Sequence, residues 1–560
     1  MKLSGADILV RTLIEQGCDV VFGYPGGQII NVYDSLHKYR NELKHVLTAH
    51  EQGAAHAADG YARATGKVGV VIATSGPGAT NLVTGIATAY LDSVPVVAIT
   101  GNVPTGHLGT DSFQEIDITG ITLPITKHNY VIGSVEELAD TVREAFRLAV
   151  SGRPGPVLVD IPKDIQIACC EYVPQAPVQR EERFPAKEKR ILQAAECINE
   201  SRRPFLYFGG GLINSDAEEE LLALAEKLDA PIGCSLMGIS GVDSDHPRFL
   251  GMQGMHGHYA SSMAMHHADC SLSLGVRFND RVTGNRAKFA TNAKIIHIDV
   301  DGAELAKNVD PAHALRGDVK LTLRQLLPLL EQKDNPEWRQ TVARLREEEK
   351  QTLDHREGMT PRNAMLALNR YLGENTPVAT DVGQHQMWAA QNLRFHRPRR
   401  FISSGGLGTM GFGMGAAIGA QMATGERTVL VTGDGSFGMC LNELATAVSQ
   451  RLPLVILLLN NGVLGMVRQW QTLFFDKHYS NTILDRKTDF VLLAKAFGAD
   501  GRRAETPEQL DEALREAFAS DGPFLVECMI DKDEFVLPML PPGGSMDDII
   551  VQIERKEGVK

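Results

Sequence analysis

The sequence lacks the features that mark membrane and secreted proteins. Its longest aliphatic run, residues 454–459, is far shorter than the ~20 apolar residues that span a bilayer. None of its eight cysteines forms a CxxC pair, and several lie in apolar runs where a buried free thiol is expected. Residues 1–17 carry Asp7, Arg11 and Glu15 at helical spacing, which predicts an amphipathic helix and not a signal peptide. We therefore expect a cytoplasmic protein.

The sequence also has no excess of basic charge. Lys and Arg number 56 against 69 Asp and Glu, a net charge of −13, which argues against a broad nucleic-acid or anionic-membrane surface. The hydrophobic share of 43% is that of a globular protein, and 560 residues are enough for three domains. The 54 glycines are the informative feature, because glycine serves where backbone approaches a ligand or takes a positive φ.

Two parts of the chain repeat one pattern. Residues 57–66 (AADGYARATG) resemble residues 416–425 (AAIGAQMATG), and each is followed by an apolar strand and a glycine turn, SGPG at 75–78 and GDGS at 433–436. Residues 87–102 align without a gap on 445–460, and GPVLVD at 155–160 pairs with GPFLVE at 522–527. Four matches in one order favour an internal duplication over chance.

Apolar runs without alternation are typical of parallel strands buried on both faces. We therefore predict an α/β fold of three doubly wound domains with mainly parallel sheets, of which the middle one is Rossmann-like, with ligands beyond the carboxyl ends of the strands. The predicted segments are 1–172 (first domain), 173–190 (polar linker), 191–335 (middle domain), 336–358 (charged helical linker), 359–545 (third domain) and 546–560 (tail).

The strongest site motif combines Gly433-Asp434-Gly435 with Asn461, which follows 27 residues after the aspartate. Each lies at the end of a predicted strand, and neighbouring parallel strands would bring the two side chains together. A carboxylate, an amide oxygen and a backbone carbonyl are hard ligands that suit Mg²⁺, and the glycine amides suit a phosphate. The alternative, a tight turn with a loop-capping Asn, would be the better interpretation of a GDG alone.

This motif resembles the signature of the thiamine-diphosphate-dependent enzymes, and the likeness extends over nearly the whole chain. In that superfamily the duplicated domains bind the pyrimidine and the diphosphate, and two chains pair so that the first domain of one faces the last domain of the other. The resemblance thus implies an active site at a dimer interface.

Thiamine chemistry requires a desolvated carboxyl group that bonds the pyrimidine nitrogen N1′. Glu51 follows the predicted strand 45–49 and opens a helix of small apolar residues. A glutamate in a first helical turn is common, since the helix dipole favours it there. Together with the GDG motif, Glu51 is similar to the family's cofactor-activating glutamate.

More specific motifs resemble the catalytic large subunits of acetohydroxyacid (acetolactate) synthases. They include GYPGG at 23–27, TDSFQE at 110–115, SGRPGPVLVDIPKD at 151–164, RFNDRVTG at 277–284 and NNGVLGMVRQWQ at 460–471. The resemblance implies catalytic positions at Glu51, Gly27, Phe113, Gln114 and Lys163. Arg281 matches a residue for the second ketoacid's carboxylate, and Trp470 one that favours 2-ketobutyrate.

The same resemblance implies three cofactors: thiamine diphosphate, Mg²⁺ and a structural FAD. The implied thiamine-diphosphate residues are Val382, Gly383, Gln384, His385, Gly408, Met410 (a wedge beneath the rings), Gly433, Gly435, Ser436, Gly465 and Met466, and the implied metal ligands are Asp434, Asn461 and Val463. The implied FAD residues are Arg153, Gly209, Gly210, Gly211, Leu236, Met237, Met255, His256, Gly257, Gly275, Arg277, Asp299 and Asp318.

The implied reaction decarboxylates pyruvate and ligates the hydroxyethyl carbanion to a second 2-ketoacid. The products are 2-acetolactate or 2-aceto-2-hydroxybutyrate, the first common step toward valine, leucine and isoleucine. The implied partners are a second copy of the chain, as a homodimer or homotetramer, and a separate small regulatory subunit; we expect neither nucleic acid nor membrane.

Other enzymes remain as alternatives. A flavin-free catabolic acetolactate synthase and a pyruvate oxidase share much of the pattern. A Rossmann-type oxidoreductase would explain the glycines but not Glu51 or the Asp–Asn spacing, and a binding module is least consistent with convergent polar turns. Three positions depart from the family pattern: Asn279, Gln28 and the pair Met414-Gly415.

Overall fold

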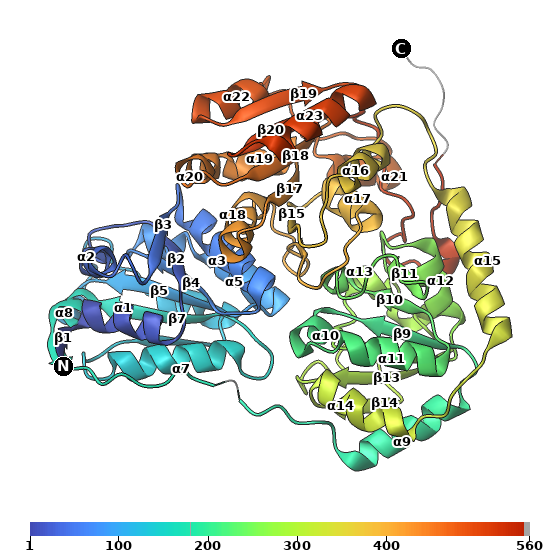
Figure 1. Cartoon of the computed structure of the whole chain (residues 1–560), viewed down its shortest axis with the longest axis horizontal. Coiled ribbons are helices and arrows are strands. Elements are labelled where there is room, and N and C mark those ends of the chain that lie inside the picture. The colour runs from blue at the N-terminus through green and yellow to red at the C-terminus, as the bar shows by residue number, and fades with distance from the viewer. Residues whose placement is uncertain (180, 554–560) are drawn as a thin grey trace.

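The computed structural model describes residues 1–179 and 181–553 and contains three α/β domains (Figure 1). In Figure 1 the first domain runs from blue to teal, the middle domain is mainly green, and the third domain runs from gold to red. Each domain is built on a six-stranded sheet in which all strands pair in parallel. The predicted fold class is confirmed. The end of the predicted tail, residues 554–560, lies outside the described residues.

The first sheet has the strand order β3-β2-β4-β5-β7-β6. Its strands are β2 (Val20–Gly23), β3 (Lys44–Leu47), β4 (Gly69–Ala73), β5 (Val96–Asn102), β6 (His128–Val131) and β7 (Val157–Pro162). A separate antiparallel pair joins β1 (Lys2–Ser4) to β8 (Cys169–Glu171). The helices of this domain are α1 (Gly5–Glu15), α2 (Ile30–Lys38), α3 (Glu51–Thr65), α4 (Pro77–Thr80), α5 (Val83–Asp92), α6 (Ile118–Thr122), α7 (Leu138–Val150) and α8 (Lys163–Ile167).

The third sheet has the order β16-β15-β17-β18-β20-β19, which is the same order as the first sheet when each is numbered along the chain. Its strands are β15 (Val378–Thr380), β16 (Phe401–Ile402), β17 (Thr428–Gly433), β18 (Leu454–Asn460), β19 (Asp500–Ala504) and β20 (Phe524–Met529). Its helices are α16 (Pro361–Asn369), α17 (Gln384–Asn392), α18 (Gly413–Thr424), α19 (Asp434–Cys440), α20 (Leu444–Ser449), α21 (Gly465–Phe474), α22 (Phe490–Phe497) and α23 (Pro507–Ala519).

The shared strand order supports the predicted duplication. The paired sequence segments occupy equivalent places: α3 with α18, β4 with β17, β5 with β18, and β7 with β20. Even the helix ends agree, because Gly66 and Gly425 terminate α3 and α18 in the left-handed conformation, with φ of 72° and 69°.

The middle sheet has the order β11-β10-β9-β12-β13-β14, the 3-2-1-4-5-6 arrangement of dinucleotide-binding folds. The apolar runs at 204–208, 231–235, 270–274 and 294–299 predict four of these strands, which the structure shows as β9 (Pro204–Phe208), β10 (Ile232–Cys234), β12 (Cys270–Leu274) and β13 (Lys294–Asp299). The sequence does not predict β11 (Phe249–Met252) and β14 (His313–Arg316). The missed strands form the two edges and carry half-buried residues. The helices are α9 (Glu188–Glu200), α10 (Gly210–Ser215), α11 (Glu218–Leu228), α12 (Tyr259–His267), α13 (Asp280–Thr283) and α14 (Val319–Leu326), and α15 (Pro336–Thr352) leads to the third domain.

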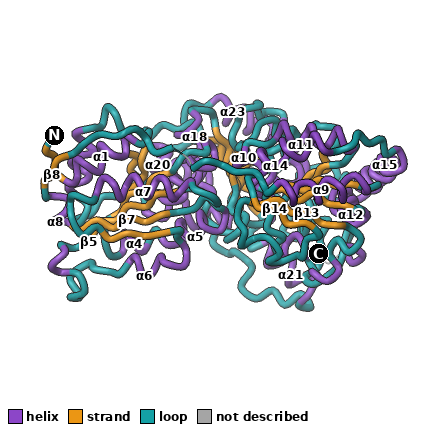
Figure 2. Tube along the Cα trace, turned by 90° about the horizontal axis from the view of Figure 1, so that it is seen from below, coloured by secondary structure: helices purple, strands orange, loops and turns teal. Residues whose placement is uncertain are grey.

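The duplicated helices α3 and α18 pack against each other and join the first and third domains. A Cβ at Gly60 would lie 2.6 Å from the Cα of Ala416, and one at Gly419 would lie 2.8 Å from the backbone nitrogen of Tyr61. Gly415, which departs from the family pattern, similarly faces the backbone oxygen of Gly53. Glycine therefore sets the close approach of the two helices. Figure 2 shows α18 between the strands of the first and middle domains.

Two further findings concern the cysteines and the helices. All eight cysteines are free thiols. Across residues 1–179 and 181–553, no helix has both the length and the apolar character needed to cross a bilayer.

Candidate active site

The predicted metal ligands lie together at the carboxyl edge of the third sheet. Strands β17 and β18 are neighbours, with Gly433 opposite Leu459, so Asp434 and Asn461 follow adjacent strand ends. Burial raises the pKa of Asp434 to about 6, although backbone N–H groups of Asn461 and Gly462 oppose this rise. Since those opposing groups are uncharged, the buried carboxylate would gain from a cation.

A small cavity opens at this edge. It is lined by Val382, Gly383, Gln384, His385, Met410, Gly433, Asp434, Gly435, Ser436, Asn461, Val463, Gly465 and Met466, among others. These are all but one of the residues predicted for thiamine diphosphate and the metal. The exception, Gly408, lies with a φ of 69° in the wall of a larger cavity described below.

Two side chains of α17, Gln384 and His385, lie in the wall of this cavity. Burial lowers the pKa of His385 to about 3, and its Nε2 is buried without a hydrogen-bond partner. The glycines leave room for it, since a Cβ at Gly433 would lie 2.8 Å from its Nδ1. Gln384 is held by donating to the Gln469 side chain at 3.1 Å and to the Glu534 carbonyl at 2.8 Å. A buried, unpaired imidazole nitrogen beside a glycine turn is a ready partner for a phosphate oxygen.

The first-domain residues gather at the carboxyl edge of their own sheet. Glu51 is the first residue of α3, and its Oε2 accepts a 2.9 Å hydrogen bond from the side chain of Asn81. Lys163 donates to the carbonyl of Gly27 at 3.0 Å. Gln114, with a φ of 62°, packs its backbone against Gly76 in the turn before α4. The five predicted catalytic residues therefore share one end of the first domain.

The small cavity at the third sheet contains none of the catalytic residues predicted in the first domain. None of Glu51, Gly27, Phe113, Gln114 and Lys163 lines either of the two cavities described for the chain. Phe113 is 82% exposed, which is unusual for a phenylalanine. The predicted catalytic residues of the first domain therefore lie outside both cavities, and Phe113 is exposed on the surface of the chain.

The larger cavity, of about 1440 Å³, lies where the three domains meet. It is lined by eleven of the predicted FAD residues: Arg153, Gly210, Gly211, Leu236, Met237, Met255, His256, Gly275, Arg277, Asp299 and Asp318. Gly209 and Gly257 do not line it. Instead they allow close backbone approaches, because a Cβ at Gly209 would lie 2.6 Å from the backbone oxygen of Gly275 and one at Gly257 would lie 2.6 Å from the backbone of Gln253. Burial raises the pKa of Asp299, at the end of β13, to about 6.

The two predicted substrate residues are in contact on the wall of this cavity. The Arg281 guanidinium lies 5.5 Å from the centre of the Trp470 ring, a cation–π arrangement. Arg281 also donates to the Met255 sulfur at 3.4 Å. The C-terminal segment closes over this group, since Leu540 donates its N–H to the Met255 carbonyl at 2.7 Å.

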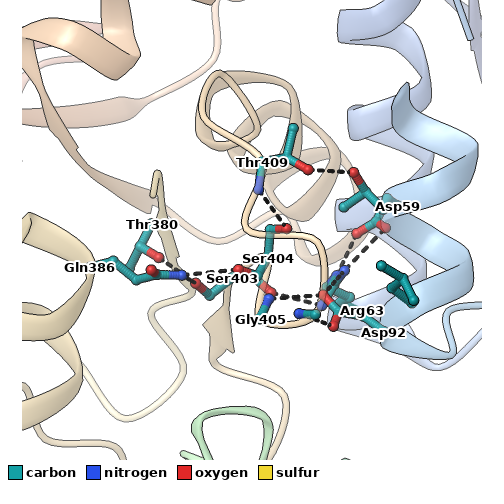
Figure 3. Close-up of polar contacts among 12 residues, drawn as sticks. Asp59, Arg63, Asp92, Thr380, Gln386, Ser403, Ser404, Gly405 and Thr409 are labelled. Carbon is teal, nitrogen blue, oxygen red and sulfur yellow. Dashed lines mark hydrogen bonds and ion pairs between the residues drawn. The ribbon is translucent and has the colours of Figure 1, made fainter. Parts of the chain in front are cut away.

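A buried polar network holds the loop that carries Gly408 and Met410 (Figure 3). The carboxylate of Asp92, on the first domain, accepts the N–H groups of Gly405 at 3.0 Å and Gly406 at 2.7 Å. Arg63 pairs with Asp92 at 3.0 Å and also with Asp59. Its guanidinium donates to the Ser403 carbonyl at 2.8 Å. The first domain thus fixes a third-domain loop beside the small cavity.

This geometry agrees with the chain's relationship to known proteins. Residues 3–121, 191–326 and 381–528 match three thiamine pyrophosphate enzyme families: the N-terminal TPP binding domain, the central domain and the C-terminal TPP binding domain. The chain is 48% identical to the Escherichia coli acetolactate synthase isozyme 2 large subunit, covering 98% of this chain and all of that protein. The chain belongs to the acetolactate synthase large-subunit family.

Other members of this family are nearly as similar. A probable acetolactate synthase large subunit of Methanocaldococcus jannaschii is 45% identical over all of this chain and 97% of its own length. The Corynebacterium glutamicum acetolactate synthase large subunit is 44% identical over 98% of this chain and 90% of its own. The predicted family is confirmed.

Sequence reasoning missed several residues that shape this acetolactate synthase-type site. Asn81, which bonds Glu51, follows the SGPG turn that was noted only as a repeat. Asp92 lies in the repeated segment 87–102 without any motif of its own. Gln469, which anchors Gln384, stands beside the predicted Trp470. The one signal available for these residues was their place inside or beside a segment that the sequence analysis had already identified.

Proposed function

We propose that this chain is an acetolactate synthase large subunit that joins two 2-ketoacids with loss of CO₂ from the first. Pyruvate is the donor, and pyruvate or 2-ketobutyrate is the acceptor, giving 2-acetolactate or 2-aceto-2-hydroxybutyrate for branched-chain amino-acid synthesis. The observation that carries the proposal is the pairing of Asp434 and Asn461 at adjacent strand ends in a chain of this family.

The third-domain residues would hold the coenzyme's polar end. Asp434, the Asn461 amide oxygen and the Val463 carbonyl would bind Mg²⁺, and His385, whose Nε2 is buried without a partner, would lie beside the diphosphate. When bound, thiamine diphosphate supplies an electron sink that stabilises negative charge at the former carbonyl carbon of pyruvate. Met410, which lines the small cavity, and Gly408, which lines the large one, would lie beside the rings of the coenzyme.

The first-domain residues would act from a second copy of the chain. Glu51 would share a proton with the coenzyme's pyrimidine, and Asn81 keeps the carboxylate oriented for that role. Glu51 lines neither cavity and Phe113 is exposed, which supports a dimer in which each first domain completes the third-domain site of the partner subunit. A separate small regulatory subunit is a further expected partner, because several relatives are isozyme large subunits.

The acceptor ketoacid would lie against Arg281 and Trp470. A guanidinium binds a carboxylate with two parallel hydrogen bonds, while the indole face favours an acceptor with one more methylene. The large cavity fits a bound FAD: Asp299, whose pKa is raised by burial, lines it, and both amide atoms of Gln253 in its wall are buried without partners. The flavin would be structural, since the net reaction transfers no electrons.

Purified protein incubated with pyruvate, Mg²⁺ and thiamine diphosphate tests the proposal. We expect acetolactate without oxygen uptake, together with flavin absorbance. Hydrogen peroxide formation would instead identify a pyruvate oxidase, and acetolactate from a colourless protein a catabolic synthase. Formation of neither product would reject the proposal.

A further inference from the structure

A buried carboxyl group of the third domain reaches the turn that presents Glu51. Glu443 ends the short helix η6 (Leu441–Glu443), directly after α19, and is 1% exposed. Its Oε2 accepts the N–H of Ala49 at 3.1 Å and the hydroxyl of Thr446 at 2.7 Å. Ala49 lies two residues before Glu51, between β3 and α3. The contact therefore joins the third domain to the backbone that orients Glu51.

Gly53 makes room for this carboxyl group. A Cβ at Gly53 would lie 2.7 Å from the Cγ of Glu443, so the side chain rests directly on the first turn of α3. Its other oxygen, Oε1, is buried and has no partner that satisfies hydrogen-bond geometry. An oxygen at a helix N-terminus meets the positive end of the helix dipole, which favours the carboxylate over a neutral group.

Neither catalysis nor the metal site accounts for Glu443. It lines neither cavity, and its carboxylate accepts hydrogen bonds from Ala49 of the first domain and from Thr446, not from the residues around Asp434. A buried carboxyl group normally has a strong compensating role, because removing it from water is unfavourable. Burial raises the pKa of Glu443, while the N–H groups of Ala49 and His50 oppose this rise.

We propose that Glu443 is a positioning residue that fixes the turn between β3 and α3 and thereby holds Glu51 in its catalytic orientation. The proposal rests on the proposed function, in which Glu51 shares a proton with the coenzyme. Replacing one carboxylate oxygen by an NH₂ group would set a donor against the N–H groups of the helix end. The turn would then shift, and misplacement of a catalytic group by ~1 Å costs on the order of 100-fold in rate.

The test compares Glu443→Gln with a matched control, Glu220→Gln. Glu220 is also a buried glutamate, 6% exposed, but it pairs with Arg324 in the middle domain. For Glu443→Gln we expect kcat to fall ~10- to 100-fold, with half-saturation by thiamine diphosphate within about twofold of the parent. The rate of deuterium exchange at C2 of the bound coenzyme, measured by NMR after acid quench, should fall by the same factor. The control should keep all three values.

A double variant separates positioning from a general structural role. If Glu443 acts through Glu51, adding Glu443→Gln to Glu51→Gln should cause no further loss of C2 exchange. Additive losses, or a raised coenzyme half-saturation with unchanged kcat, would overturn the proposal. Thr446→Val removes only one hydrogen bond to Glu443, so it should lower kcat and the C2 exchange rate by a smaller factor. This variant tests the proposal if Glu443→Gln does not fold. An absence of acetolactate formation by the parent would instead refute the proposed function.

Discussion

Gly465 gives the sharpest prediction about the coenzyme cavity. It is the first residue of α21, and a Cβ there would lie 2.7 Å from the Cδ of Gln384 and 2.9 Å from the Nδ2 of Asn461. Gln384 is 4% exposed and donates to the Gln469 side chain and the Glu534 carbonyl. Gly465→Ala would therefore displace both a predicted coenzyme residue and a predicted metal ligand.

The magnitude follows from the bonds that the displacement breaks. Two hydrogen bonds of Gln384, each contributing ~0.5–1.5 kcal/mol, amount to ~1–3 kcal/mol. This free energy corresponds to a ~5- to 140-fold rise in the thiamine diphosphate concentration that gives half-saturation. The assay is a titration with thiamine diphosphate at fixed Mg²⁺, followed both by activity and by calorimetry.

A matched control is Gly522→Ala in the same domain, since a Cβ at Gly522 meets no atom within 4 Å. We expect the control to bind the coenzyme like the parent. Unchanged half-saturation in Gly465→Ala, with a melting temperature equal to that of the parent, would refute the packing argument.

Three further predictions concern other parts of the molecule. Trp470→Leu should lower the preference for 2-ketobutyrate over pyruvate ~10-fold in a competition assay of products, because an indole face is lost; an unchanged product ratio would contradict the assignment. Asp160→Asn should become more stable relative to the parent as pH rises from about 4 to 7, because burial raises the pKa of Asp160 from 3.8 to about 7 in the folded state and folding therefore opposes its ionisation over that range. Above pH 7 the difference should stay constant, and a difference in melting temperature that does not vary with pH would argue against this. Asp92→Asn should raise the half-saturation for thiamine diphosphate, because Asp92 accepts the N–H groups of Gly405 and Gly406 beside the cavity; normal binding would show that the loop holds without it.

Much of the fold could be predicted from the sequence because its central strands are buried on both faces. Such strands appear as uninterrupted apolar runs, and β9, β12 and β13 begin and end where the sequence predicts. The edge strands β11 and β14 were missed, since half-buried edge residues leave no such run. The packing of α3 on α18 was also unpredicted, although the repeated small residues in both helices permit it.

Some residues of the candidate site could likewise be predicted from the sequence, and others could not. Asp434, Asn461 and their glycine neighbours were predicted because strand ends bring them together within one domain. Asn81, Asp92 and Glu443 were not, since each acts through contacts with residues distant in the chain. Ala49 and Glu443 are 394 positions apart in the sequence, so no local pattern connects them.

Mixing two inactive variants tests the central claim, a coenzyme site built from the first domain of one chain and the third domain of another. Glu51→Gln and Asp434→Asn should each be inactive alone. After dissociation and reassociation at equal amounts, half the dimers would contain one intact site, and we predict recovery of about a quarter of parental acetolactate formation. Mixtures that stay as inactive as the separate variants would contradict the claim, because they would place both residues of a working site in the same chain.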